Sequence, residues 1–63
     1  MYVVKHNDEI IATASSIEGA VQAVDDCTGY EFRVTDELSS TRYQLTSNEG
    51  EIEMELIPVE HYD

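Results

Sequence analysis

Basic residues are almost missing from this chain. Only Lys5, Arg33 and Arg42 stand against fourteen Asp and Glu, which gives a formal net charge of −11 in 63 residues. Solubility asks a small domain for a net charge of only about 2–8, and a larger excess raises self-repulsion in the compact state. High charge is typical of disordered chains, but 41% of these residues are apolar and they follow regular patterns. We therefore expect a folded chain whose acidity needs an explanation beyond solubility.

Cysteine is also nearly missing. Cys27 is the one cysteine, so no internal disulfide can form, and with only His6 and His61 beside it there is no four-ligand zinc set. The N-terminus lacks a basic leader and a long apolar stretch, and no apolar run approaches the roughly 20 residues that cross a bilayer. We expect a cytoplasmic protein with no metal, no cofactor and no membrane contact.

The length predicts a single acidic domain over residues 1–63, with 59–63 as a tail that frays. A chain this short buries only about 60% of its unfolded surface, so its core is thin. Formation of a homodimer is one way to add buried area.

Apolar periodicity predicts a hairpin followed by one helix. The β-rich runs 2–5 and 10–14 flank a turn-forming stretch, which is typical of a hairpin. A capping box from Ser15 to Glu18 predicts the start of the helix, and Gly29 its left-handed end. The apolar residues between them recur at helical spacing and form one stripe: Ile17, Ala20, Val21, Val24 and Cys27.

The second half of the chain alternates apolar and polar residues in three runs, 30–35, 42–46 and 51–56. These runs predict three strands, joined by turns at 36–41 and 47–50. The order is then ββαβββ, an α+β fold with an antiparallel sheet of four to five strands and the helix packed on one face. The residues expected in the core are Ile17, Val21, Val24, Phe32, Val34, Leu45, Ile52, Met54 and Leu56.

Catalytic arrangements are not evident. The three glycines are isolated, so no phosphate-binding loop is formed. Cys27 lies in the apolar stripe, where a small buried hydrophobe is the better interpretation than a nucleophile. His6 falls in a turn and His61 in the tail. General acid–base catalysis needs two carboxylates in contrasting environments, whereas these fall on polar faces and in turns. We expect no catalytic residues and a protein that is not an enzyme.

The acidic residues follow a spatial pattern. Glu51, Glu53 and Glu55 alternate with apolar residues, so they project from one side of a strand at intervals of about 6.6–6.8 Å, close to the step between successive phosphates. The other residues of the predicted partner-binding surface are Glu49 in the adjoining turn, Asp25 and Asp26 near the helix end, and Asp36 and Glu37 in another turn. DNA-binding proteins gain much of their affinity by neutralising phosphates, so carboxylates at this spacing suit the same basic groove. An ordinary half-exposed strand also alternates in this way, with Arg33 and Arg42 pairing across the sheet.

In size, in charge and in these acidic rows, the chain resembles the small phage-encoded anti-CRISPR and anti-restriction proteins that imitate DNA. The resemblance rests on Glu49, Glu51, Glu53, Glu55, Asp25 and Asp26. It implies a non-enzymatic inhibitor that blocks the basic DNA-binding groove of a bacterial defence protein, with a CRISPR effector complex as the target, and that does not itself bind nucleic acid.

Two other hypotheses remain open. A small interaction module, such as an antitoxin-like or assembly protein, would use a sheet edge or an apolar patch. A housekeeping domain from a salt-loving organism would be acidic and poor in lysine because high salt screens its self-repulsion.

Overall fold

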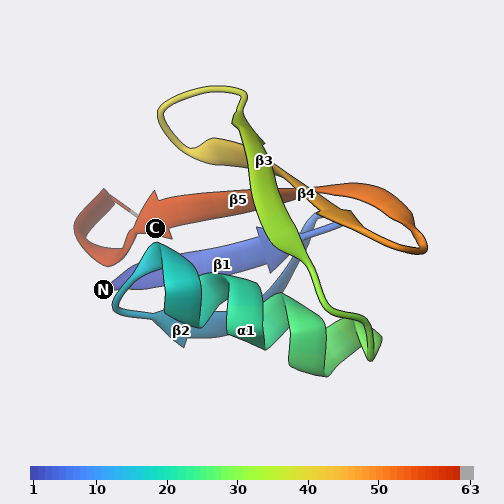
Figure 1. Ribbon diagram of the computed structural model, residues 1–63. Coiled ribbons are helices and arrows are strands. Elements are labelled where there is room, and N and C mark those ends of the chain that lie inside the picture. Colours follow the sequence, from blue (N-terminus) through green and yellow to red (C-terminus); the bar gives the residue numbers. More distant parts are fainter. Residues whose placement is uncertain (62–63) are drawn as a thin grey trace.

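The computed structural model describes residues 1–61 and contains one sheet and one α-helix (Figure 1). Its elements, in chain order, are β1 (Tyr2–His6), β2 (Glu9–Ala14), α1 (Ile17–Thr28), β3 (Arg33–Glu37), β4 (Arg42–Ser47), β5 (Gly50–Pro58) and the 3₁₀ turn η1 (Val59–His61). The predicted α+β class and the order ββαβββ are confirmed. Tyr62 and Asp63, the end of the tail expected to fray, lie outside the described residues.

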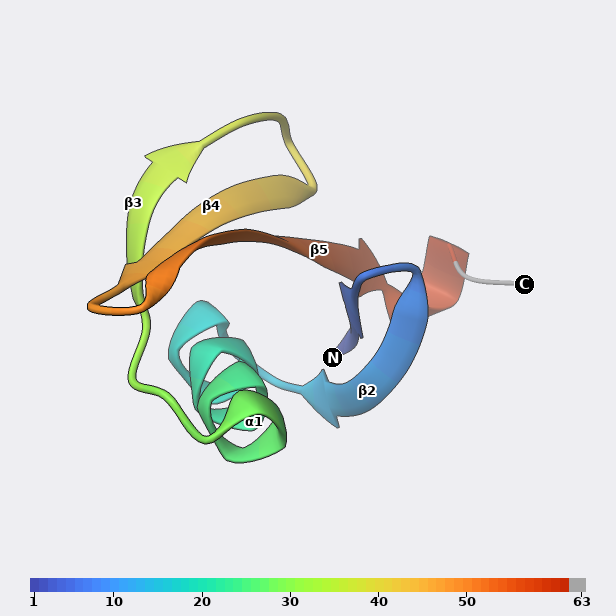
Figure 2. The ribbon, with the colours of Figure 1, turned by 90° about the vertical axis from the view of Figure 1, so that its right-hand side faces the viewer.

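All neighbouring strands of the sheet are antiparallel, in the order β2-β1-β5-β4-β3. The last strand of the chain is therefore central, and β2 and β3 form the edges. Figure 2 shows that the sheet curves around α1. The helix packs mainly on β2 and β1, whereas every residue of β3 is exposed, so this edge strand is left uncovered.

The first hairpin turns through Asn7 and Asp8, which both have positive φ, 56° and 64°. A two-residue turn with positive φ at both positions matches the twist of paired strands, and Asn and Asp tolerate it better than most residues. The predicted hairpin is confirmed. Its register skips Ile11 between the pairs Val4–Ala12 and Lys5–Ile10, which is a β-bulge.

The helix begins one residue later than the capping box predicts. Ser16, not Ser15, is the N-cap, and its Oγ accepts a hydrogen bond from the backbone N–H of Gly19 at 3.1 Å. Glu18 is then not the third helical residue, so the reciprocal half of the box does not form. Because Ala14 still pairs with Tyr2 in the sheet, Ser15 is the residue that connects β2 to the N-cap. At the other end, Gly29 has a φ of 81°, and the predicted left-handed cap is confirmed.

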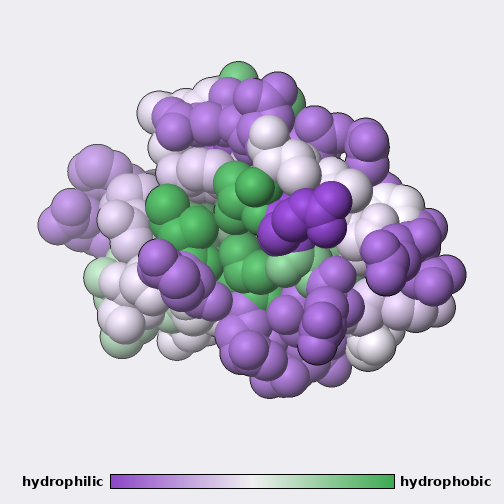
Figure 3. Space-filling view, in the orientation of Figure 1, coloured by the Kyte–Doolittle hydropathy of each residue, from purple (hydrophilic) through white to green (hydrophobic). Residues whose placement is uncertain are grey.

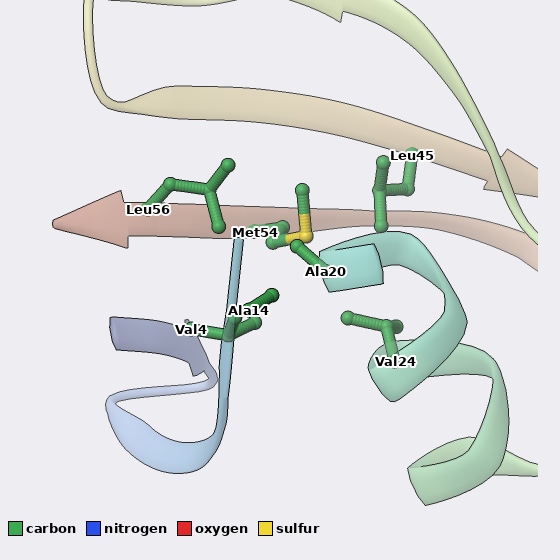
Figure 4. Close-up of a cluster of buried hydrophobic side chains, with 7 residues drawn as sticks. All are labelled: Val4, Ala14, Ala20, Val24, Leu45, Met54 and Leu56. Atoms are coloured by element: carbon green, nitrogen blue, oxygen red, sulfur yellow. The ribbon is translucent and has the colours of Figure 1, made fainter. Parts of the chain in front are cut away.

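The core lies between α1 and the centre of the sheet (Figure 4). Its fully or nearly fully buried side chains are Val4, Ala14, Ala20, Val24, Leu45, Met54 and Leu56. Four of the nine expected core residues are among them, and Val21, Phe32 and Ile52 are half-buried. The prediction is wrong for Ile17 and Val34, which are 38% and 41% exposed. Val34 pairs with Leu45 and so faces the inner side, but the helix does not reach β3 to cover it.

Two boundaries in the second half also differ from the prediction. Tyr30 and Phe32 precede β3, and the strand instead continues through Asp36 and Glu37. A bulge at Thr35 permits this, because pairing with β4 resumes one residue later at Asp36. The turn is therefore shorter than expected. It is closed by hydrogen bonds from the N–H groups of Leu38 and Ser39 to the carbonyl oxygen of Arg42.

Candidate partner-binding surface

The row Glu51, Glu53 and Glu55 lies on the outer face of the sheet, which we define as the face turned away from α1. Along β5 the apolar residues between these glutamates turn inward, and Met54 and Leu56 are buried. Glu51 and Glu53 are exposed, whereas Glu55 is half-buried. The structure thus places the three carboxylates on one side, as their alternation predicts.

All three cations of the chain lie on this outer face. Arg42 on β4 and Lys5 on β1 are both directly opposite Glu55, and the Nε atom of Arg42 is 4.0 Å from Oε2 of Glu55. Arg33 pairs with Thr46, which in turn pairs with Glu51. The Nε2 group of Gln44 donates a hydrogen bond of 2.6 Å to Oε2 of Glu51. The outer row is therefore part of a cross-strand polar network of the kind that stabilises sheets.

Asp36 and Glu37 do not form a single acidic site. Because consecutive strand residues point to opposite faces, Asp36, opposite Gln44, shares the outer face, while Glu37, opposite Tyr43, points to the inner side. Both side chains are exposed at the edge of the sheet.

The two aspartates near the end of α1 have different surroundings. Asp25 is half-buried, and its Oδ1 accepts a hydrogen bond of 2.8 Å from the backbone N–H of Phe32. As a residue of the predicted partner-binding surface Asp25 is expected to be exposed, and this expectation is wrong, because the chain after Gly29 folds back against the helix. Asp26 is exposed and accepts a hydrogen bond from Nε2 of Gln22 at 3.1 Å. Carboxylates here are disfavoured by the helix dipole, and the bond to Phe32 gives Asp25 a structural reason to be present.

A second group of carboxylates gathers around Tyr30 and Phe32, at the C-terminal end of α1. Two hollows meet at these two aromatic residues. One, of about 530 Å³, is lined by Gln22, Asp25, Asp26, Gly29, Tyr30, Glu31 and Phe32. The other, of about 190 Å³, is lined by Thr28, Tyr30, Phe32, Ser47, Glu49, Gly50, Glu51 and Ile52.

We call this surface the acidic end: Asp25, Asp26, Glu31, Glu49 and Glu51 around Tyr30 and Phe32. Among the described residues that line its two hollows there is no Lys or Arg. The sequence pattern missed Glu31 and Tyr30, because their alternation with Phe32 was read as part of a strand. The signal that could have found them is Gly29, since a left-handed residue redirects the chain after a helix.

Cys27 is exposed, so the prediction of a buried thiol is wrong. The buried residues of α1 are Ala20 and Val24, and the helix presents Cys27 beside this line instead of within it. His6 is half-buried, with Nδ1 3.4 Å from the carbonyl oxygen of Glu53. Within residues 1–61, no three His, Cys, Asp or Glu side chains are grouped to hold a metal ion.

An apolar patch opens on the inner side of the molecule. Figure 3 shows hydrophobic side chains at the surface between α1 and β3. The exposed large hydrophobic residues of these two elements are Ile17 and Val34, with Val21 and Phe32 half-buried nearby in the chain. This patch exists because the helix packs mainly on the β1–β2 side of the sheet and leaves β3 exposed.

None of the helices in the described part of the chain is both long enough and apolar enough to cross a membrane. Comparison of the chain with known protein families, with curated proteins and with solved structures finds no match.

Proposed function

We propose that the protein is a non-enzymatic inhibitor that imitates the nucleic-acid backbone. It would occupy the basic DNA-binding groove of a bacterial defence protein, and a CRISPR effector complex is the target that its resemblance to small acidic phage proteins implies. It would act in the host cytoplasm. Direct binding to nucleic acid is not part of the proposal, because the phosphates and a chain of charge −11 repel each other.

The observation that carries the proposal is the separation of the charges. Lys5, Arg33 and Arg42 all lie on the outer face of the sheet, so the carboxylates of the acidic end are left without a cation among their lining residues. Uncompensated carboxylates on a folded scaffold attract a basic surface and steer its approach. The proposal therefore moves the main contact from the outer row to the acidic end, with Glu51 belonging to both.

A competition assay tests the proposal. Labelled DNA is bound to a purified CRISPR effector complex, and the unlabelled protein is titrated in at several salt concentrations. We expect displacement of the DNA, and we expect the protein's own affinity for the complex to fall steeply between about 0.05 and 0.5 M salt as the Debye length shrinks. Failure to displace DNA from any such complex would contradict the proposal.

The apolar patch between α1 and β3 favours a second candidate function, a small interaction module. Exposed apolar side chains beside an edge strand are a common site of protein association. Binding through Ile17 and Val34 would depend little on salt, unlike binding through carboxylates. The same titration therefore separates the two functions. A protein that folds only in molar salt would instead support the halophile hypothesis.

A further inference from the structure

The smaller hollow of the acidic end combines an apolar floor with a charged rim. Phe32 and Ile52 are half-buried within it, and Tyr30 is 50% exposed at its edge. Glu49 and Glu51, both exposed, complete the rim on the side of the turn between β4 and β5. Long cationic side chains match this arrangement of apolar floor and charged rim. Their apolar stems pack on apolar surface, while their charged heads stay near water and carboxylates.

The wall that carries Tyr30 is fixed to the end of α1. The N–H of Gly29 donates to the carbonyl oxygen of Asp25 at 2.8 Å, and the N–H of Phe32 donates to the carboxylate of the same residue. The Thr28 hydroxyl donates to the carbonyl oxygen of Val24 at 2.9 Å and accepts from the N–H of Tyr30 at 3.4 Å. Little conformational entropy is then lost when a ligand packs on this wall.

The opposite wall is fixed in a similar way. The Oγ atom of Ser47, which is buried, accepts from the N–H of Glu49 at 3.0 Å and lies 3.4 Å from the carbonyl oxygen of Gly50. Gly50 has a φ of 141°, a conformation that other residues rarely adopt, although nothing lies within 4 Å of where a Cβ would be. The turn therefore holds its shape through local hydrogen bonds and one glycine, and it presents Glu49 at the rim.

We infer that this hollow takes an arginine side chain from an extended basic segment of a protein partner. The guanidinium group stacks on Tyr30 and donates hydrogen bonds to Glu49 or Glu51, while its stem packs on Phe32 and Ile52. A planar guanidinium suits both an aromatic face and a carboxylate, which a compact ammonium does less well. Charge argues against a second copy of the chain as occupant, because two such rims would repel each other.

This inference deepens the proposed function, since both need a basic protein partner, but its test does not need a defence complex. The probe is a fluorescent peptide of alternating glycine and arginine, with the lysine peptide of the same length for comparison. We expect the arginine peptide to bind more tightly than the lysine peptide. In ¹⁵N-labelled full-length protein, its addition should shift the amide signals of 28–32 and 47–52 more than those of β1 and β2.

Substitutions sharpen the test. Tyr30→Leu should weaken the arginine peptide about two- to fivefold, whereas Tyr30→Phe, which keeps the ring, should bind as the unmodified chain does. Glu49→Gln should weaken binding at low salt more than Glu53→Gln, an exposed glutamate of the outer face. Spectra outside the hollow check that each variant keeps its fold.

Equal binding of the two peptides, or a Tyr30→Leu variant with unchanged affinity, would overturn the inference. Peptide binding at this hollow without any displacement of DNA from a defence complex would support the inference and contradict the proposed function. Displacement of DNA without peptide binding would support the proposed function and contradict the inference.

Discussion

On the outer face of the sheet, Glu55 lies between Arg42 and Lys5, whereas at the acidic end Glu31 and Glu49 line hollows in which the described residues include no cation. Both regions expose carboxylates, and the net charge of the chain does not distinguish them. The register of the sheet does, because it places every basic residue on one face. The positions of the Lys and Arg residues, and not those of the Asp and Glu residues, therefore decide which carboxylates are free to contact a partner.

The difference has an energetic side as well. Carboxylates opposite cations on neighbouring strands contribute to the sheet, at roughly 0.2–1 kcal/mol for each pair. Carboxylates gathered without cations repel one another and lower the stability of the compact state. We therefore expect the Arg42–Glu55 pair to stabilise the outer face slightly, and the carboxylates of the acidic end to carry a cost that a basic partner would offset.

The largest expected effect comes from neutralising the two regions separately. One aspartate and two glutamates are changed in each region, so the variants match in size and charge: Asp26→Asn, Glu31→Gln and Glu49→Gln at the acidic end, and Asp36→Asn, Glu53→Gln and Glu55→Gln on the outer face. We expect the first triple variant to lose about 10- to 100-fold in affinity for the basic partner, and the second less than about threefold. Competition with labelled DNA at low salt measures both.

A similar loss in both variants would mean that the total charge, and not the acidic end, drives binding. A larger loss in the outer-face variant would return the main contact to the row on β5. Circular dichroism and thermal unfolding of each triple variant check that the fold is retained.

The next effect concerns the two neighbouring aspartates of α1. Asp25→Ala removes the acceptor of the part-buried Phe32 N–H, so the free energy of unfolding should fall by about 1–3 kcal/mol. Asp26→Ala removes only an exposed bond to Gln22 and should change it by less than about 0.5 kcal/mol. Denaturant unfolding of the two variants measures the difference. Equal losses would contradict the structural role of Asp25.

Local patterns of the sequence predicted the elements well. Alternation predicted that Met54 and Leu56 lie in the core, and the residue type of Gly29 predicted the left-handed end of the helix. Both signals depend only on residues that are neighbours in the chain. Ile17 and Val34 were wrongly expected in the core, because their burial depends on how far α1 extends across the sheet. That extent is set by tertiary packing, and the apolar periodicity of one helix or strand carries no information about it.

The candidate site was predicted less well, for a related reason. The row on β5 follows from alternation, but its pairing with Arg42 and Lys5 follows from the strand order, which the sequence left open. The acidic end joins the segment after α1 to the turn before β5. No short-range pattern connects Glu31 with Glu49, so only the folded chain brings them to one surface.

The smallest expected effect compares single glutamates of the two regions. Glu55→Gln removes the partner of Arg42 and faces Lys5 on the other side, so we expect the free energy of unfolding to fall by about 0.2–1 kcal/mol. Glu49→Gln removes only repulsion at an exposed turn, so stability should stay the same or rise slightly.

Salt should reduce the effects of both substitutions on the free energy of unfolding, although the two effects have opposite signs. Added salt screens the attraction between Glu55 and its cations, so the loss caused by Glu55→Gln should shrink as ionic strength rises from about 0.05 to 1 M. It also screens repulsion, so any gain from Glu49→Gln should shrink too. Urea unfolding of the three proteins at low and high salt measures both trends. If Glu55→Gln were as stable as the unmodified chain at low salt, the outer-face charges would contribute nothing to the sheet, and the contrast between the two regions would rest on binding alone.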